Sequence, residues 1–435
     1  MARVAIIGAG AMGLAAAYHA TKAGHQVEVF EREGVPGGMA AHFDFGGFSL
    51  ERYYHFVCKT DEPTFELMRE LGIGDKMRWV PTSMGFFNDG RLHDWGNPVA
   101  LLRFPGISLL QKLRYGLMMF LSVRRRAAGK LEHMSAKDWI ESWCGAQGYA
   151  RLWKPLFDLK FYEFADNISA AWIWARIKRL GSSRRSLMQE ELGYIEGGTA
   201  TLVNALVGAI ETFGGKIRLR AQVVEITSTG GHVTGVLSEG VHEAFDAVIS
   251  TIPAPLVTGT IPTLPDDYKT FFNSIDNIGV ACLVFKLKSS VTRHFWVNIT
   301  DPRIAIPGFV EFSNLRPAPE TIVFVPYYMP ITNSKWAYAD DQLVSEAFGY
   351  LKMINPRLTN ADLVDSKVAR LRYAQPICPP GFAARVPPVR TPIKGLQIAD
   401  TCFYYPEDRG IAESVRYGRL MARAIDDPDV RIGPA

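Results

Sequence analysis

The sequence predicts an α/β fold whose central parallel sheet is assembled from segments far apart in the chain. Residues 4–7 (Val-Ala-Ile-Ile) are a short apolar run typical of a buried parallel strand. The alanine-rich segment 11–23 has the composition of a helix, and residues 26–31 follow as a second strand. Short apolar runs recur at 247–252 and 395–400, so we expect both halves of the chain to contribute to the fold.

Length and composition narrow the function. The chain has 435 residues, 48% of them hydrophobic, which is enough for two domains. Its net charge is only +4 and the charges are interspersed, which disfavours nucleic-acid binding. The five cysteines form no C-x-x-C pair, so we expect neither a disulfide framework nor a metal site, and a cytoplasmic location fits best. We expect no membrane-spanning segment.

A glycine-rich turn, Gly8-Ala9-Gly10-Ala11-Met12-Gly13, joins the first strand to the helix. Gly8 permits the tight turn, Gly10 lets a diphosphate approach the backbone, and Gly13 lets the helix pack on the strand. The helix N-terminus, which includes Ala11 and Met12, offers free N–H groups to phosphate oxygens. Glu31 ends the second strand, where an acid accepts hydrogen bonds from ribose hydroxyls. Together these features predict a Rossmann-type dinucleotide-binding unit.

A second glycine pair indicates which dinucleotide is bound. The segment Arg32-Glu33-Gly34-Val35-Pro36-Gly37-Gly38-Met39 resembles the extended motif of a large FAD family. That family contains amine oxidases, protoporphyrinogen oxidases, phytoene desaturases and UDP-galactopyranose mutases, and in it this loop lies along the FAD diphosphate and ribityl chain. The resemblance therefore implies FAD, with Arg32, Gly37, Gly38 and Met39 beside it.

Two later segments extend the resemblance over most of the chain. Residues 194–199 and 222–226 resemble the central segment of the family, in which the backbone at the position of Val223 contacts adenine. Residues 395–412 resemble its closing segment, which implies that Asp400 lies by the pyrophosphate or ribityl chain. Ile411 and Ala412 would then face the pyrimidine edge of the flavin, at a helix N-terminus.

The resemblance implies a Rossmann-like FAD-binding domain of the amine oxidase and glutathione-reductase type, with a discontinuous α+β substrate domain. We expect the first to comprise residues 1–58, 190–255 and 385–435. The second would comprise 59–189, rich in helical patterns, and 256–384.

Departures from the family pattern bear on the reaction. Amine oxidases carry a lysine on a substrate-domain strand, and the matching position here is near Ala281. One wall of their aromatic cage falls near Gly410. Simple amine oxidation is therefore disfavoured. Cys378 lies loosely where some amine oxidases attach FAD, but its surroundings do not resemble that attachment motif, so we predict non-covalent FAD.

The candidate catalytic residues come from two segments. In residues 49–56, His55 is a candidate for hydrogen bonding or proton transfer near the flavin, the alternative being a buried histidine that bonds the backbone. Arg52 would meet an anionic substrate group, or else pair with Glu51 or a helix end. Near the closing helix, three residues are expected to contact flavin or substrate: Tyr404, Tyr405 and Arg409.

Two basic features have alternative interpretations. Lys160 and Arg176 either line a substrate pocket or lie on solvated faces. Residues 103–126 form an amphipathic basic stretch that ends in three arginines. That stretch suits peripheral contact with an anionic membrane or the mouth of a site for lipid-like substrates, and equally a core helix with an exposed basic end.

These observations predict an FAD-dependent oxidoreductase that removes or adds hydride at a C–C or C–N bond of a small organic substrate. A mutase-like flavin enzyme acting on a nucleotide sugar is one alternative. A flavin-binding protein that has lost its chemistry is another.

Overall fold

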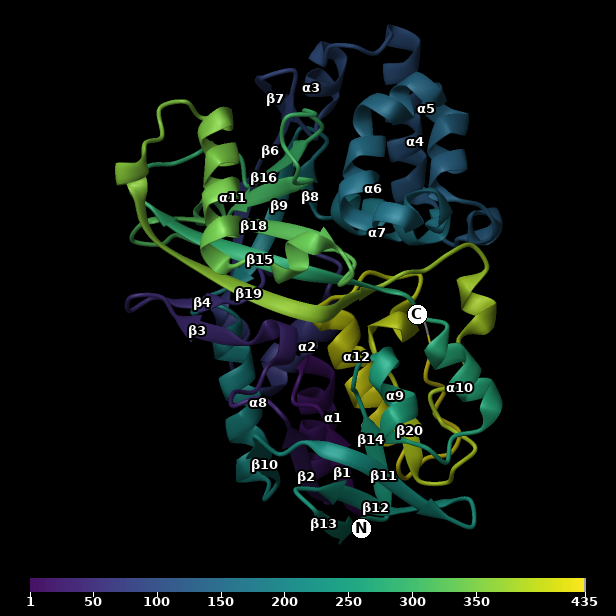
Figure 1. Ribbon diagram of the computed structural model, residues 1–435. Coiled ribbons are helices and arrows are strands. Elements are labelled where there is room, and N and C mark those ends of the chain that lie inside the picture. The colour runs from purple at the N-terminus through teal and green to yellow at the C-terminus, as the bar shows by residue number, and fades with distance from the viewer. Residues whose placement is uncertain (434–435) are drawn as a thin grey trace.

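The computed structural model describes residues 1–433. Its five-stranded parallel sheet has the order β10-β2-β1-β14-β20. The strands are β1 (Arg3–Ile7), β2 (Gln26–Glu31), β10 (Lys216–Leu219), β14 (Ala247–Ser250) and β20 (Leu396–Ile398). Central β1 and β14 are almost wholly apolar and buried, because both of their faces are covered. Figure 1 shows this sheet in the lower half of the molecule.

Three long helices pack together beside this sheet: α1 (Ala11–Lys22), α8 (Thr199–Thr212) and α12 (Ile411–Arg423). Helix α1 contacts both of the others. A Cβ on Gly418 would lie 2.4 Å from the carbonyl oxygen of Met12, so only glycine lets α12 approach α1 this closely. The middle of α12 is thereby held against the first turns of α1.

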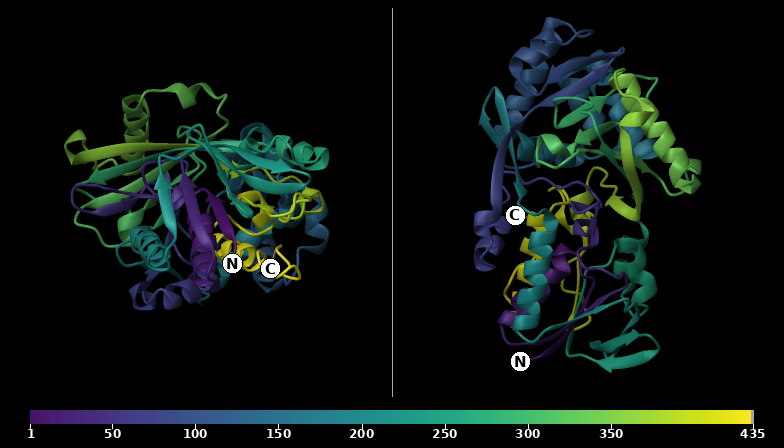
Figure 2. Two further views of the ribbon diagram at one scale, coloured as in Figure 1. Left: turned by 90° about the horizontal axis from the view of Figure 1, so that it is seen from below. Right: turned by 90° about the vertical axis from the view of Figure 1, so that its left-hand side faces the viewer.

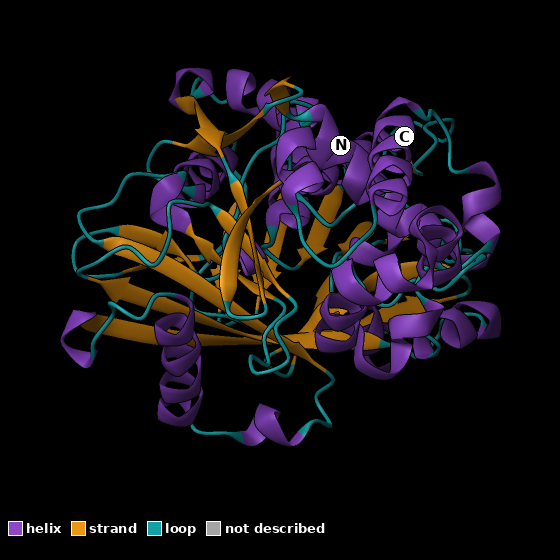
Figure 3. Cartoon of the chain, turned by 90° about the horizontal axis from the view of Figure 1, so that it is seen from above, coloured by secondary structure: helices purple, strands orange, loops and turns teal. Residues whose placement is uncertain are grey.

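The second large sheet has seven strands in the order β19-β15-β18-β17-β16-β6-β7. They are β6 (Met84–Asn88), β7 (Arg91–Trp95), β15 (Asn277–Leu287), β16 (Trp296–Ile299), β17 (Gly308–Glu311), β18 (Thr321–Met329) and β19 (Leu363–Pro376). One face packs against α11 (Asp340–Ile354) through a separate apolar core. The other face contributes to the core that also includes the parallel sheet. Figure 3 shows the long strands side by side, with a group of helices next to them.

Five helices form the upper right part of Figure 1: α3 (Pro98–Arg103), α4 (Leu109–Arg124), α5 (Ala136–Leu152), α6 (Lys154–Phe161) and α7 (Ala170–Ser182). The remaining helices are α2 (Glu62–Glu70), α9 (Ala254–Thr260) and α10 (Asp266–Asn273). The right-hand view of Figure 2 shows an elongated molecule with the N-terminus at one end and the C-terminus near the middle.

Three small sheets complete the fold. Their strands are β3 (His42–Asp44) with β4 (Ser49–Glu51); β5 (Met77–Thr82), β8 (Arg184–Ser186) and β9 (Gln189–Ile195); and β11 (Val223–Thr229), β12 (His232–Ser238) and β13 (Val241–Ala244).

The structure differs from the sequence prediction at two places. Residues 60–190 are not only helical, because they hold the β6–β7 hairpin that ends the seven-stranded sheet. The longest strand, β19, has no clear strand pattern in its sequence. It lies at the sheet edge and is half-exposed along most of its length, so it lacks the strict apolar alternation of an inner strand.

Candidate active site

The glycine-rich turn lies at the carboxyl ends of the parallel strands, where α/β sheets bind their ligands. Gly8 has a φ of +102°, and a Cβ on it would lie 2.7 Å from Oγ1 of Thr251, just past β14. A Cβ on Gly13 would lie 1.9 Å from the carbonyl oxygen of Gly8. A Cβ on Gly10, by contrast, would meet no atom within 4 Å. The loop is therefore closely packed on its inner side and open at Gly10.

Helix α1 begins next to this opening. Its N-cap, Gly10, has no side chain to bond the first N–H groups of the helix. The first turn of an α-helix leaves such donors without intrahelical partners, and they carry a partial positive charge. The arrangement fits a diphosphate, because these donors have no side-chain cap and a Cβ on the neighbouring Gly10 would meet no atom within 4 Å.

The second glycine pair is held against the first. The N–H of Gly37 donates to the carbonyl oxygen of Ala9 (2.7 Å). A Cβ on Gly38, whose φ is +56°, would lie 3.1 Å from Cα of Gly10. The two glycine segments therefore form one continuous backbone surface. This close approach explains why the sequence needs glycine twice.

Glu31 lies at the same edge and is 8% exposed. Its Oε2 accepts a hydrogen bond from the N–H of Ala9 (2.8 Å), and its Oε1 accepts one from the N–H of Glu33 (2.9 Å). Each carboxylate oxygen accepts up to two hydrogen bonds, so each can accept one more. Glu31 both fixes the loop and presents acceptor capacity beside it.

The segment before β11 brings Val223 to this edge. The N–H of Ala221 donates to the carbonyl oxygen of Glu31 (2.9 Å), and the N–H of Arg220 donates to that of Glu33 (3.0 Å). Arg32 is exposed and lies 3.5 Å from the Glu33 carboxylate, whereas Met39 is half-buried. The structure thus gathers residues from two distant segments around Glu31.

Asp400 follows β20 and is buried. Its carboxylate accepts hydrogen bonds from the N–H groups of Ala254 (2.7 Å) and Cys402 (2.8 Å), which hold the turn after β20 against the start of α9. Burial raises the pKa of this carboxyl. Asp400 therefore shapes the carboxyl edge of the sheet through the backbone.

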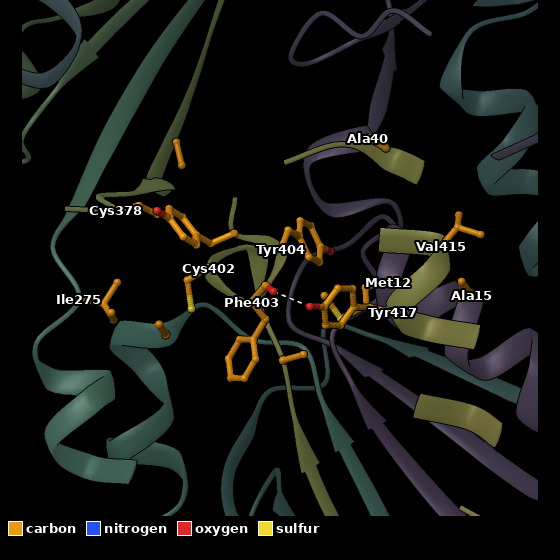
Figure 4. Packing of buried hydrophobic residues seen from close by; sticks show 14 of the residues in the cluster. Met12, Ala15, Ala40, Ile275, Cys378, Cys402, Phe403, Tyr404, Val415 and Tyr417 are labelled. Carbon is orange, nitrogen blue, oxygen red and sulfur yellow. Dashed lines mark hydrogen bonds between the residues drawn. The ribbon is translucent and has the colours of Figure 1, made fainter. Parts of the chain in front are cut away.

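The closing segment connects this edge to α12. Tyr404 donates a hydrogen bond to Oγ of Ser414 (2.9 Å). The hydroxyl of Tyr417 donates to the carbonyl oxygen of Phe403, as the dashed line in Figure 4 shows. The N-cap residue of α12 is Gly410, which has no side chain that could cap the helix. The N–H groups of Ile411 and Ala412, in the first turn, therefore receive no hydrogen bond from a capping side chain. The second uncapped helix N-terminus is thus positioned by buried aromatic residues.

His55 lies in the half-buried segment after β4. Burial lowers the pKa of its imidazole to about 4, so the ring is neutral at pH 7. Its Nδ1 is buried and has no partner among the described residues. The neighbouring Tyr54 approaches Tyr328 of β18, with 3.4 Å between the two hydroxyl oxygens. His55 is therefore a buried neutral imidazole, close enough to Arg409 and Arg179 for their charges to lower its pKa further.

Glu51 forms a buried ion pair that the sequence did not reveal. Its carboxylate binds Arg316 (Nη1–Oε2, 3.3 Å) and accepts the N–H of Thr199 at the start of α8 (2.9 Å). The alternative that Glu51 pairs with Arg52 is therefore wrong. No local pattern predicts the true pair, because 265 positions separate its members. The side chain of Arg52 has no ion pair in the described part of the chain and is half-buried.

The position matched to the amine-oxidase lysine requires a correction. Ala281 of β15 faces α11, in the core on the far side of the sheet. Its neighbours Val280 and Cys282 face the parallel-sheet side. The lysine on that face is Lys286, and its Nζ donates to the carbonyl oxygen of Phe45 (2.7 Å). No side chain at positions 280–282 supplies a basic group.

A small cavity lies where β19 ends and the closing segment begins. Its walls are Trp172, Gln375, Pro376, Cys378, Thr401, Tyr405, Glu407 and Arg409. The hydroxyl of Tyr405 bonds Ser169 (2.6 Å) and Glu132 (2.7 Å), so this group is held by the helical region. Burial raises the pKa of the Cys378 thiol, which keeps it protonated. Two predicted residues, Tyr405 and Arg409, therefore meet here.

Lys160 and Arg176 also lie close to this cavity. Lys160 Nζ lies 4.9 Å from the centre of the Tyr328 ring, and Arg409 Cζ lies 5.9 Å from it. Arg176 packs over Trp172 and pairs with Asp408 (2.9 Å). Lys160 is half-buried with its Nζ against Tyr328, so the interpretation that it lies on a solvated face is wrong; burial, together with Arg176 and Arg409, lowers its pKa well below the usual value.

Comparison with known proteins agrees with this geometry. The chain is 26% identical over 326 residues to a protein of Synechococcus elongatus named "Probable zeta-carotene desaturase", covering 67% of each. It is 27% identical over 308 residues to the 15-cis-phytoene desaturase of the same organism, covering 63% of each. The chain thus spans about two thirds of the length of these relatives.

Solved structures share the fold. A "Putative protoporphyrinogen oxidase" from Exiguobacterium sp. 255-15 superposes with a TM-score of 0.77 at 18% identity, covering 97% of this chain and 98% of the other. Putrescine oxidase superposes with a TM-score of 0.72 at 16% identity, covering 98% of both. The family model of flavin containing amine oxidoreductases matches residues 13–425. With nearly its whole length matched, the chain belongs to the family of flavin-containing amine oxidoreductases.

Proposed function

We propose that the chain binds FAD without a covalent bond and transfers hydride between it and an organic substrate at a C–C or C–N bond. The observation that carries the proposal is the open backbone surface formed by Gly10, Gly37 and Gly38 at the start of α1. When bound, the flavin supplies the two-electron redox chemistry. Membership of a flavin-containing family supports the cofactor class.

The residues around that surface have separate roles in this proposal. The N–H groups of Ala11, Met12 and Gly13 bind the diphosphate, and Glu31 binds the ribose beside it. Val223 lies at the adenine end, with Arg32 and Met39 bordering the loop. At the other end Asp400, through the turn it shapes, and the start of α12 hold the flavin ring, where uncapped N–H groups stabilise negative charge.

His55 is the residue we propose for proton transfer. Its imidazole is neutral at pH 7 and its buried Nδ1 has no partner among the described residues, so the ring can take a proton transiently from a substrate held against it and, with its low pKa, give that proton up readily. The relatives are desaturases and oxidases. The absence of a basic side chain at positions 280–282 favours oxidation of a carbon–carbon bond over simple amine oxidation.

The absorbance spectrum of the purified protein tests the cofactor. Heat denaturation should release a yellow compound that chromatography identifies as FAD, and the Cys378→Ala variant should carry the same amount. A colourless protein that takes up no FAD would refute the proposal. Flavin that stays with the denatured chain of the wild type, but not with that of the variant, would refute the non-covalent part.

Turnover separates the enzyme classes. Anaerobic flavin reduction by an organic substrate is expected of an oxidoreductase. Redox-neutral conversion of a nucleotide sugar that requires prior flavin reduction would show the mutase-like alternative. A loaded protein whose flavin no candidate substrate reduces would indicate lost chemistry.

We also propose peripheral contact between α4 and an anionic membrane. No helix among residues 1–433 is long and apolar enough to span a bilayer. The outer face of α4 nevertheless exposes a row of large apolar side chains within an arc of about 120°, at about 100° per residue. They are Leu109, Leu110, Leu113, Leu117, Phe120 and Leu121.

Basic residues accompany this face. Arg114, Arg124 and Arg126 are exposed on and just after α4, whereas the opposite face of the helix packs on the protein through Tyr115 and Met118. An exposed apolar face with flanking cations is typical of helices that lie in the headgroup region. The face also suits an enzyme that takes an apolar substrate from a membrane.

Vesicle sedimentation tests this contact. Leu113→Glu and Leu117→Glu should each lower binding to phosphatidylglycerol vesicles by at least fivefold. Leu187→Glu, at an exposed leucine outside α4, is the matched control and should bind like wild type. Equal binding of all variants, or equal binding to neutral phosphatidylcholine, would contradict the proposal.

A further inference from the structure

Helix α8 is capped by a side chain from a distant strand. Its N-cap residue, Gly198, has no side chain that could bond the first N–H groups. Glu51, at the end of β4, takes this role, because its Oε1 accepts the N–H of Thr199, the first residue of the helix (2.9 Å). A Cβ on Gly198 would lie 2.7 Å from that oxygen and 2.4 Å from Nη1 of Arg316. The start of α8 is therefore packed directly against the Glu51–Arg316 pair.

The same threonine holds the second glycine pair. Oγ1 of Thr199 donates to the carbonyl oxygen of Ala40 (2.8 Å), and both residues are 4% exposed. Ala40 ends the short 3₁₀ helix Gly38–Ala40, which directly follows Gly37. At the other end of this loop, the N–H of Gly37 donates to the carbonyl oxygen of Ala9 (2.7 Å). The loop is therefore held at one end by the first glycine turn and at the other by α8.

Arg316 connects these contacts to the seven-stranded sheet. It lies just after the short helix Phe312–Asn314, between β17 and β18. Its Nη1 lies 3.3 Å from Oε2 of Glu51, and its Nη2 donates to the carbonyl oxygen of Ser49 (2.8 Å). Its Cζ lies 4.4 Å from the centre of the Phe48 ring. A continuous series of contacts thus runs from the seven-stranded sheet to the glycine loop.

The buried ion pair supplies direction more than stability. Glu51 and Arg316 are 3% and 5% exposed. Removal of two charges from water commonly costs as much as their attraction returns, so an apolar pair of the same volume stabilises a fold at least as well. Burial raises the pKa of Glu51 although Arg316 acts in the opposite direction, which reflects this cost. What an apolar pair lacks is a directional bond to the N–H of Thr199.

We propose that Glu51, Arg316 and Thr199 are positioning residues that hold the Gly37–Gly38 loop in the place where it binds FAD. They act through the carbonyl oxygen of Ala40 and do not themselves touch the cofactor. This inference rests on the proposed function, because that function assigns the loop to FAD.

FAD titration of the apoprotein tests the role of Thr199. Thr199→Val removes the bond to Ala40 at nearly constant volume, and FAD affinity should fall roughly fivefold, which corresponds to one hydrogen bond. Thr199→Ser keeps a hydroxyl and should bind like wild type. Thr212→Val is the control, because Thr212 bonds only the carbonyl oxygen of Gly208 within α8. Equal affinity of Thr199→Val and Thr212→Val would overturn the proposal.

Hydrogen exchange in the apoprotein separates position from stability. The N–H groups of Ala40 and Ala41 bond Gly37 and Gly38 within the loop, so they should exchange faster in Thr199→Val. The amides of residues 206–210, inside α8, should exchange as in wild type. Faster exchange in both segments would show a merely structural role and would overturn the inference. A faster loop with unchanged FAD affinity would overturn it as well.

Two double variants test the ion pair. Glu51→Gln/Arg316→Met and Glu51→Leu/Arg316→Met both remove the charges, but only glutamine keeps an oxygen for the N–H of Thr199. The leucine variant should bind FAD roughly fivefold more weakly than the glutamine variant. Equal affinities would refute the role of Glu51. The Thr199 variants decide the proposal if either double variant does not fold.

Wild-type FAD uptake separates this inference from the proposed function. A wild-type apoprotein that takes up no FAD would refute the proposed function, and the inference with it. Normal FAD uptake by wild type and by Thr199→Val, with equal loop exchange in both, would refute the inference alone.

Discussion

A Cβ atom on Gly13 would lie 1.9 Å from the carbonyl oxygen of Gly8, too close for any side chain. Gly10, between them in sequence, faces open space. One turn therefore contains a glycine that the packing of the fold requires and a glycine whose side-chain position is open. This contrast allows the cofactor proposal to be tested apart from folding.

Gly10→Ala should fold normally and lose flavin. The added methyl group meets no protein atom, but it occupies the surface at which we place the diphosphate. We expect FAD affinity to fall at least tenfold, which is about 1.4 kcal/mol, as measured by titration of the apoprotein. Gly208→Ala is the control, because Gly208 in α8 is also open. Unchanged affinity in Gly10→Ala would contradict the assignment.

Gly13→Ala should instead destabilise the fold itself. The methyl group has no room against Gly8, and overpacking costs about 1–3 kcal/mol or more. Urea unfolding of the apoprotein should show a lower midpoint than that of Gly10→Ala. Equal midpoints would mean that α1 shifts to make room for the methyl group with no loss in the free energy of unfolding.

Glu51→Gln should be strongly destabilising. Glu51 and Arg316 are 3% and 5% exposed, and removal of one partner leaves a buried charge unpaired. Loss of about 3–5 kcal/mol in the free energy of unfolding is expected, by denaturant titration. Glu70→Gln, which breaks the more exposed pair with Lys22, should cost less than about 1 kcal/mol. Similar losses for both would contradict this account.

Acid should destabilise the protein partly through His55. Burial holds its pKa at about 4 in the folded chain, against 6.5 in the unfolded chain. Between these values the unfolded chain binds more protons, so the stability present above pH 6.5 is lost as the pH falls toward 4. His19, with its pKa also at about 4, acts in the same direction.

The variant His55→Gln should therefore be less sensitive to acid. The loss of unfolding free energy between pH 7.5 and pH 5 should shrink by about 1–2 kcal/mol relative to wild type. Urea midpoints at the two pH values measure this. The exposed His232→Gln is the control, and a profile for His55→Gln that matches it would contradict burial of the imidazole.

Local sequence determined the segments that we assign to the cofactor. The turn from Gly8 to Gly13, the strand ending at Glu31 and the helix beginning at Ile411 were all predicted at the places where they occur. Each is fixed by glycine spacing or apolar periodicity within about 30 residues, so neighbouring positions contain the information.

Only the tertiary structure decided how the side chains outside those segments are arranged. It turned Ala281 away from the parallel sheet, paired Glu51 with Arg316, and brought Gln375 to Arg409. These outcomes depend on which face of a strand is covered and on which distant segment covers it. A shift of one residue reverses the face of a strand, and a pair 265 positions apart leaves no local pattern. Packing of the whole chain is therefore what places the charged groups beside one cavity.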